Sequence, residues 1–207
     1  SFRWICCAAL AIVPVGNRIV VMTDMRAPVG DLGGFGALRP FVNLRVHSAF
    51  SLLEGALSVS KIADFAVADG SPAVGIADTD NLFGALDFAQ KATKAGVQPI
   101  IGCQLTVSFS GSPASSATHE AGQPLVLIAA TEEGYSNLMR LVSRAYMESE
   151  DGKTVGLPVT WLSTASSGII CLTGGARGPV GAVVLDEPGE ARARLVKLHS
   201  LFGNRLY

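Results

Sequence analysis

Two stretches of the chain decide its fold: FVNLRVHSAFSLLEGAL (residues 41–57) and PAVGIADTDNLFGALDFAQKATKAGVQPIIGCQLTV (residues 72–107). Apolar runs that suit buried strands alternate here with helical patterns, at a repeat of about thirty residues, the size of a strand–helix–strand unit. A polar cluster accompanies each apolar run: His47-Ser48, residues 78–81 and Cys103-Gln104. Because polar side chains at strand ends build the active sites of α/β barrels, the pattern predicts an α/β fold with a site at this edge of the sheet.

Outward from this core, the alternation continues to the end of the chain. The apolar runs predict strands at residues 41–46, 72–77, 99–107, 125–130 and 168–173. Helices are expected from Ser58 to Gly70, from Asp80 or Asn81 to Gly96, from Glu132 through Ala145, and from Pro188 to Gly203. Their inward residues are expected to include Ile62, Phe65, Ala66, Leu82, Phe83, Leu86, Ala89, Leu138, Leu141, Val142, Leu195, Leu198 and Phe202. Strands that alternate with helices predict a parallel sheet.

The composition of the chain excludes some classes of function. The chain has 207 residues, 49% of them hydrophobic, and a net charge of -1, which suits one folded domain or a large piece of one. Nucleic-acid affinity depends on a surplus of Lys and Arg, and this chain has none, so direct DNA binding is not expected from it. The four Cys residues form no Cys-x-x-Cys pair, and we interpret them as free thiols in a reducing cytoplasm.

The first forty residues differ from the rest. An apolar run from Trp4 to Val15 is too short to span a membrane and is broken by Pro14 and Gly16. Met22 and Met25 precede a Gly- and Pro-rich linker, and either Met is a candidate for the true translation start. We therefore expect residues 1–40 to be an extension and linker that is disordered or not native, followed by one domain over residues 41–207. The apolar start also leaves a small secreted or membrane-associated protein as a lesser alternative.

The sequence motifs LRVHSAFSLLEGAL and QPIIGC resemble the N-terminal PHP (polymerase and histidinol phosphatase) domain of bacterial DNA polymerase III alpha subunits. The resemblance covers most of the chain after residue 40. It implies a distorted (β/α)7 barrel, incomplete here at the C-terminus, with a cluster of divalent metals held by His, Asp, Glu and Cys side chains at the strand ends. In such a site, paired metals generate hydroxide and clamp phosphate oxygens.

This chain departs from the family at the metal positions. The resemblance implies a degenerate site formed by six residues, which are Arg45, His47, Glu54, Asp78, Thr79 and Gln104. Arg45 stands where the family has the first His of a His-x-His pair, Thr79 where a His follows the Asp, and Gln104 where an acidic residue is expected. Pro124 and Gly175 replace a further His and Cys, and Cys171 lies four positions too early to substitute.

Only His47, Glu54 and Asp78 remain as candidate ligands, too few for a multi-metal centre. The guanidinium of Arg45 stays protonated in proteins, so it repels a metal ion and could instead pair with Glu54 or Asp78. We therefore expect a site without metal or catalysis.

The resemblance implies that the parent protein is a cytoplasmic, DNA-directed DNA polymerase of chromosomal replication. Its polymerase domain, absent from this sequence, would use Mg²⁺ and contact the DNA. This portion would support the polymerase and dock the proofreading exonuclease and other replicase subunits. No membrane contact is expected. The alternative is a stand-alone, metal-dependent PHP phosphoesterase, against which the missing ligands count.

Overall fold

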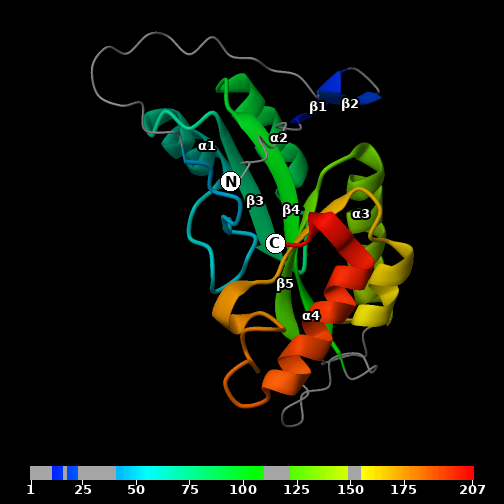
Figure 1. Ribbon diagram of the computed structural model, residues 1–207. Coiled ribbons are helices and arrows are strands. Elements are labelled where there is room, and N and C mark those ends of the chain that lie inside the picture. Colours follow the sequence, from blue (N-terminus) through cyan, green and yellow to red (C-terminus); the bar gives the residue numbers. More distant parts are fainter. Residues whose placement is uncertain (1–10, 16–17, 23–40, 110–121, 149–154) are drawn as a thin grey trace, which may run out of the picture.

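The computed structural model describes residues 11–15, 18–22, 41–109, 122–148 and 155–207, and these form a mixed α/β structure around one central sheet (Figure 1). The sheet has the order β3-β4-β5-β7, and the short β6 pairs with the end of β4. Its strands are β3 (Ala73–Thr79), β4 (Gln98–Ser108), β5 (Gln123–Ala129), β6 (Leu157–Pro158) and β7 (Ile169–Leu172). Within the described residues the sheet stays open, as expected of an incomplete, distorted barrel.

The helices follow the predicted alternation. They are α1 (Val59–Ala68), α2 (Ala85–Lys94), α3 (Glu132–Glu148) and α4 (Pro188–Phe202), with short 3-10 turns η1 (Val159–Thr164), η2 (Gly175–Arg177) and η3 (Gly203–Arg205). The hydroxyl of Ser58 accepts a hydrogen bond from the backbone N–H of Lys61, so Ser58 caps α1 as predicted. Gly70 and Gly96 follow α1 and α2 with positive φ angles, as the helix-stop pattern indicated.

The prediction of a parallel sheet is wrong for one strand. β3 and β4 are parallel, but β5 runs antiparallel to both β4 and β7. The connection from β4 to β5 has no apolar helical period in its sequence, and a parallel neighbour needs a crossover that is usually a helix. An antiparallel return therefore suits this connection.

Residues 41–46, predicted as a strand, pair with β3 only locally. Val46 forms an isolated parallel bridge with Ile76, and two β3 amides, those of Gly75 and Ala77, donate to the carbonyls of Asn43 and Val46. A Cβ on Gly75 would lie 2.6 Å from the carbonyl oxygen of Leu44, so only glycine permits this close approach. The segment thus runs along β3 without becoming a regular strand.

The two faces of the sheet differ because side chains alternate along each strand. One face carries Val74 and Ile76 of β3 and the odd-numbered residues of β4, from Ile101 to Val107, and all four helices pack against it. In Figure 1, α1 and α2 lie beside β3 and β4, and α3 and α4 lie toward β5 and β7. The opposite face carries a smaller apolar cluster around Ala77, Val126 and Ile128. We call these the helix face and the inner face.

Helix α2 differs from its prediction in both its start and its orientation. It begins after Gly84, so neither Asp80 nor Asn81 caps it. Phe83 and Leu86 were predicted inward but are 68% and 60% exposed. The later start rotates the buried stripe onto Ala85, Phe88, Ala89 and Ala92, and the three alanines are small enough for α2 to pack closely on α1.

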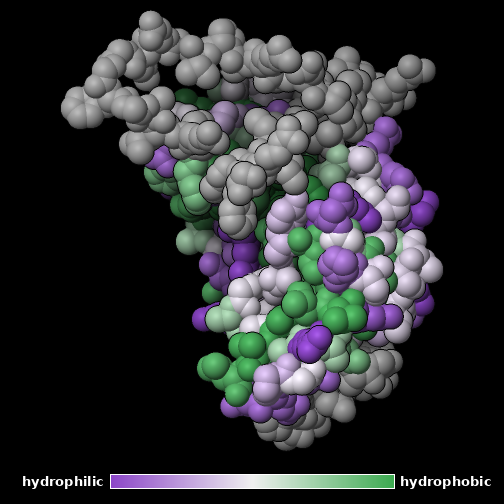
Figure 2. Space-filling view, viewed as in Figure 1, coloured by the Kyte–Doolittle hydropathy of each residue, from purple (hydrophilic) through white to green (hydrophobic). Residues whose placement is uncertain are grey.

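Two other predicted inward residues are exposed. Phe65 of α1 is 58% exposed, and Leu195 of α4 is 42% exposed, while Leu198 and Phe202 are buried as predicted. Figure 2 shows hydrophobic side chains gathered over α4 and the turn before it. The exposed apolar residues there are Val184, Leu185, Leu195 and Val196. The outer side of α4 is therefore an apolar surface.

The ends of the chain add two further features. Before residue 40, β1 (Ala11–Val15) and β2 (Arg18–Met22) form an antiparallel hairpin, and the rest of that region, including Met25, lies outside the described residues. At the other end, Leu206 forms a parallel bridge with Cys171, so the chain runs beside β7 there. No helix among the described residues is long and apolar enough to cross a bilayer.

Candidate functional site

A pocket of about 590 Å³ lies at the edge of the sheet where β3 ends. Seven residues line it: Arg45, His47, Leu53, Glu54, Gln104, Pro124 and Arg177. Gln104 and Pro124 are even-numbered residues of β4 and β5, like the inner-face residues Ile100, Val126 and Ile128, so the pocket opens on the inner face, away from helices α1–α4. The structure therefore brings together four of the six predicted site residues, and the other two, Asp78 and Thr79, end β3 beside it.

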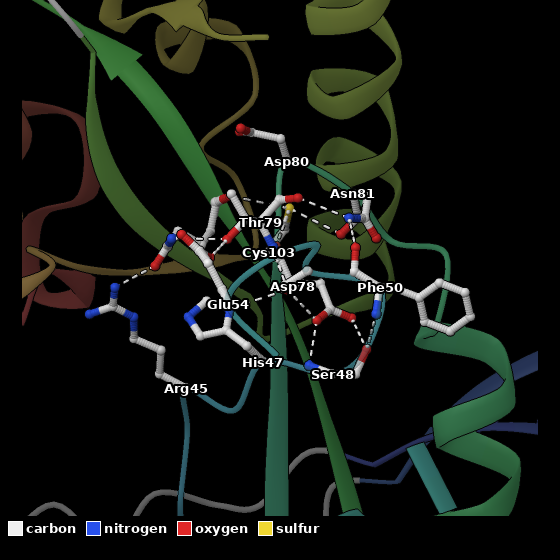
Figure 3. Close-up of polar contacts among 12 residues, drawn as sticks. Arg45, His47, Ser48, Phe50, Glu54, Asp78, Thr79, Asp80, Asn81 and Cys103 are labelled. Carbon is white, nitrogen blue, oxygen red and sulfur yellow. Dashed lines mark hydrogen bonds and ion pairs between the residues drawn. The ribbon is translucent and has the colours of Figure 1, made fainter. Parts of the chain in front are cut away.

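Asp78 is buried and anchors the loop that follows residue 46. It is 3% exposed. One carboxylate oxygen accepts the backbone N–H of Ser48 at 2.6 Å and the hydroxyl of Ser51 at 2.6 Å, and the other accepts the hydroxyl of Ser48 at 2.7 Å (Figure 3). Three donors satisfy a buried carboxylate, and they fix the loop of residues 47–55 to β3.

Arg45 is linked to the carboxylate of Glu54 through hydrogen bonds of two neutral side chains, those of Gln104 and Thr79. Its guanidinium donates to the Gln104 side-chain oxygen at 2.5 Å, and the Gln104 amide donates to the Thr79 hydroxyl at 3.1 Å. That hydroxyl in turn donates to Glu54 (Figure 3). We call this chain of contacts the Arg45–Glu54 relay. The prediction that Arg45 pairs directly with Glu54 or Asp78 is wrong for the described residues. Arg45 bonds to Gln104 instead, and the Asp78 carboxylate bonds to Ser48 and Ser51.

His47 lies between Ser51, a hydrogen-bond partner of Asp78, and Glu54, the last residue of the relay. Its Nδ1 lies 3.3 Å from the Ser51 hydroxyl oxygen and 3.9 Å from a carboxylate oxygen of Glu54. Because Ser51 gives its only hydroxyl proton to Asp78, the contact between Ser51 and His47 requires a proton on Nδ1. This tautomer leaves Nε2 as the ring's acceptor.

Asp80 and Asn81 turn the chain away from β3. Asp80 has a φ of 54°, and its carboxylate accepts the Thr106 backbone N–H at 2.9 Å and the Thr106 hydroxyl at 3.0 Å. Burial raises the pKa of Asp80, while the two Thr106 hydrogen bonds oppose the rise. The Asn81 amide donates to the carbonyls of Phe50 and Thr79. Both residues therefore hold the turn that follows β3.

The two described cysteines are core residues. Cys103 donates through its thiol to the carbonyls of Asp78 and Asn81, both at 3.3 Å, and Cys171 is buried among the residues of the helix face. Burial raises the pKa of Cys171 to about 12 and that of Cys103 well above the usual value. Both thiols are therefore unsuited to ligation or nucleophilic attack at neutral pH.

Sequence reasoning missed two residues of the pocket, Arg177 and Leu53. Arg177 belongs to the Gly-rich sequence GGARG, which forms η2, and the left-handed Gly174 and Gly175 place it at the pocket wall. A basic residue in a Gly-rich turn after a strand was the available signal. Leu53 has a φ of 67° and is fully exposed, and nothing in its sequence context indicated this.

A family model described as the PHP domain matches residues 43–207 of the chain. The relatives include the DNA polymerase III subunit alpha of Caulobacter vibrioides (43% identical over 81% of this chain) and that of Pseudomonas aeruginosa (32% over 81%). The error-prone DNA polymerase of Symbiobacterium thermophilum is 33% identical over 81% of the chain. The chain spans only 15%, 14% and 16% of these three proteins, respectively.

Two solved structures align with a smaller part of the chain. An amidohydrolase from Chromobacterium violaceum, with bound sulfate and no metal, aligns over 51% of this chain and 33% of its own, with a TM-score of 0.40 and 21% identity. A metal-dependent phosphoesterase from Bifidobacterium adolescentis aligns over the same shares, with a TM-score of 0.39 and 14% identity.

Proposed function

The chain belongs to the PHP domain family, and from this premise we propose that it is the PHP portion of a DNA polymerase III alpha subunit. The relatives that carry this name match most of the chain, and they support the proposal. The parent protein would then be a cytoplasmic DNA-directed DNA polymerase of chromosomal replication. DNA contact and the Mg²⁺-dependent synthesis step would belong to its polymerase domain.

Within that parent, the PHP portion acts as a metal-free scaffold. The observation that carries this proposal is the engagement of Asp78, whose two oxygens accept three hydrogen bonds from Ser48 and Ser51, on about four available lone-pair sites. Carboxylate ligands of Zn²⁺ or Mn²⁺ need free lone pairs directed at the ion. Asp78 instead directs its lone pairs at the protein's own hydroxyl and amide groups.

The other family positions add to this argument. Glu54 accepts the Thr79 hydroxyl, and Gln104 places a neutral amide where a carboxylate would be needed. Arg45 brings a permanent positive charge to the same pocket. Among the described residues, no group of three or more His, Cys, Asp and Glu side chains is arranged to hold a metal ion. The residues present do not fit a multi-metal centre.

The scaffold role also needs a surface for partners, and Leu53 supports one. A non-glycine residue at positive φ costs about 1–2 kcal/mol, and here the strain displays a leucine entirely to solvent. Leu52 is 83% exposed beside it, and Phe50 packs edge-to-face on the exposed Phe83. Apolar side chains held out by a strained loop suit burial by a protein partner. We assign this surface, the Leu52–Leu53 loop, to docking of the proofreading exonuclease subunit.

The metal-free proposal is tested by metal analysis of the full-length protein after incubation with Zn²⁺ and Mn²⁺. We expect no tightly held ion that depends on His47, and no phosphatase activity toward p-nitrophenyl phosphate that His47→Ala removes. The triple variant Arg45→His/Thr79→His/Gln104→Glu, which restores three metal-binding side chains, is the positive control and gains metal. Tight metal in the wild type, lost in His47→Ala, overturns the proposal and revives the phosphoesterase alternative.

The docking proposal is tested by co-purification of the full-length protein with the exonuclease subunit from the same organism. Leu53→Asp is expected to weaken the complex at least about tenfold, because it removes the exposed apolar contact and Asp tolerates positive φ. Leu185→Asp is the matched control, since Leu185 is 92% exposed in the turn before α4. Equal affinity of wild type and Leu53→Asp would contradict docking at this loop.

A further inference from the structure

The outer side of α3 carries a second pocket, of about 550 Å³, apart from the site at the end of β3. The described residues that line it all belong to α3, and they are Ser136, Met139, Arg140, Ser143, Arg144 and Met147. We propose that this surface, the α3 outer face, binds an amphipathic helical segment of another protein. The segment sets two carboxylates, one helical turn apart, against Arg140 and Arg144, and its apolar side chains cover Met139 and Met147.

The α3 outer face is not the side of α3 that builds the core. The buried residues of α3, among them Leu138, Leu141 and Ala145, pack in the cluster on the helix face of the sheet. Met139 is 41% exposed and Met147 is 85% exposed, about two helical turns further along. Methionine is flexible and polarisable, so it packs well against partners of varied shape. Two exposed methionines on one helix therefore suit burial by a protein.

Arg140 and Arg144 supply the charge that selects the partner. They stand four residues apart in the helix, so their guanidinium groups lie on adjacent turns and repel each other. No carboxylate is among the described residues that line the pocket. Within the same described residues, Arg140 contacts only the Asn137 side-chain oxygen, at 3.5 Å, and forms no ion pair. Carboxylates from a partner would relieve the repulsion and accept charge-assisted hydrogen bonds.

Arg144 is already ordered for this contact. The central carbon of its guanidinium lies 3.8 Å from the centre of the Trp161 ring, and its Nε donates to Glu148 at 2.6 Å. Glu148 also contacts one terminal nitrogen, at 3.5 Å, and no other described residue bonds to the second one. That nitrogen keeps two N–H donors for a partner. A side chain ordered before binding loses less entropy on binding, which increases affinity.

The acidic residues at both ends of α3 favour a protein partner over a nucleic acid. Glu132 and Glu133 are exposed in the first turn, and Glu148 ends the helix. A nucleic-acid backbone is negative along its whole length, so it would meet these carboxylates wherever it followed the helix. A peptide helix can confine its carboxylates to the two positions that face the arginines. Local charge complementarity of this kind gives specificity.

The α3 outer face is also distinct from the Leu52–Leu53 loop. In Figure 1, α3 lies at the right of the molecule, whereas residues 41–57, in blue and cyan, lie at the left. The inference therefore does not rest on the docking proposed for that loop, and the two surfaces can be tested separately.

Photo-crosslinking of the full-length protein in its own cells tests the inference. p-Benzoylphenylalanine replaces Met147, and the peptides captured on irradiation are identified by mass spectrometry. We expect a captured peptide with two acidic residues four positions apart in an amphipathic helical pattern. Arg140→Glu should lower its yield at least about tenfold, because a carboxylate then faces the partner's carboxylates. Arg192→Glu, at an exposed position of α4, is the matched control and leaves the yield unchanged.

A charge exchange separates lost recognition from a damaged fold. Replacement of one of the two captured carboxylates by arginine should restore the yield with Arg140→Glu, which a fold defect in α3 would not allow. Absence of a captured peptide, a peptide without the acidic pair, or equal yields with and without Arg140→Glu would each overturn the inference.

Two further results would assign the capture elsewhere and also overturn the inference. One is a yield that falls with Leu53→Asp but not with Arg140→Glu, because the partner would then dock at the Leu52–Leu53 loop. The other is a yield abolished by nuclease treatment before irradiation, because the contact would then depend on a nucleic acid.

Discussion

Asp78 and Ser48 are joined by two hydrogen bonds, one from the Ser48 backbone N–H at 2.6 Å and one from its hydroxyl at 2.7 Å. The Ser48 hydroxyl also accepts the backbone N–H of Phe50, which fixes its orientation. A residue type that elsewhere serves as a metal ligand here holds the loop of residues 47–55 on the sheet. This contact makes Asp78 a determinant of stability.

Removal of this carboxylate is expected to loosen the loop. Asp78→Ala leaves a buried N–H and two buried hydroxyls without their acceptor, at a cost of about 3 kcal/mol. Asp186→Ala, at an exposed position before α4, is the control and changes stability by less than about 0.5 kcal/mol. Hydrogen exchange of the peptides that cover β3 and residues 47–55 measures the effect, and equal protection in the two variants would contradict the role given to Asp78.

The close approach of residues 41–46 to β3 depends on Gly75. In Gly75→Ala the new Cβ meets the Leu44 carbonyl 2.6 Å away, and we expect a loss of about 2 kcal/mol. The displaced segment carries Arg45 and His47, so the walls of the pocket at the end of β3 should move as well. Gly189→Ala places a Cβ in open space on α4 and should be neutral or stabilising by about 0.5 kcal/mol. Thermal unfolding of both variants provides the comparison.

Thiol alkylation should distinguish the core cysteines from exposed ones. Because the pKa of Cys171 is about 12 and that of Cys103 is well above its usual value, neither forms thiolate at pH 8 in the folded protein. We expect peptide mass spectrometry to find both unmodified after brief iodoacetamide treatment, and both modified once the protein is unfolded in urea. Rapid modification of Cys103 in the native protein would contradict its burial.

Asp80 should make the folded protein less stable as the pH rises, whereas an ion-paired carboxylate makes a protein more stable as the pH rises. Its folded-state pKa is raised above 3.8, so the folded state binds its proton more tightly than the unfolded state does. That contribution to stability is present at low pH and is lost as the pH rises through the raised pKa. Asp80→Asn removes the titration, and its stability relative to wild type should therefore increase with pH.

A second variant at this position isolates the hydrogen bonds from the charge. Asn keeps an acceptor for the Thr106 N–H and tolerates the φ of 54°, whereas Asp80→Ala loses both contacts and should be less stable than Asp80→Asn by about 2 kcal/mol at all pH values. Denaturant unfolding at several pH values distinguishes the two. A wild-type advantage over Asp80→Asn that grows with pH would show that the sign is wrong.

Much of the fold follows from local sequence patterns. Continuous apolar runs located β3, β4, β5 and β7 to within a few residues, and the cap at Ser58 and the glycines after α1 and α2 marked helix ends. The inward residues of α3 were also predicted correctly, because its apolar period is regular over several turns. Long, regular signals of this kind depend little on tertiary context.

The sequence-based predictions were wrong where contacts between distant parts of the chain determine the structure. The direction of β5 is set by its connection and by pairing with β7, which no local pattern records. The start of α2 shifted because the Asn81 side chain accepts the N–H of Phe83 in a turn of its own. Arg45 was expected to pair with a carboxylate, but its partner, Gln104, lies 59 positions away in sequence.

The reversed direction of β5 has a consequence for how the pocket can vary among related chains. Because β5 runs antiparallel to β4, its first residues lie at the edge of the sheet where β4 ends, and its contribution to the pocket, Pro124, comes directly after the β4–β5 connection. Lengthening or shortening that connection would alter a pocket wall while leaving the strand order intact. Evolution and protein engineers alike can therefore change what the pocket admits through insertions and deletions at one point in the chain, without redesigning the sheet.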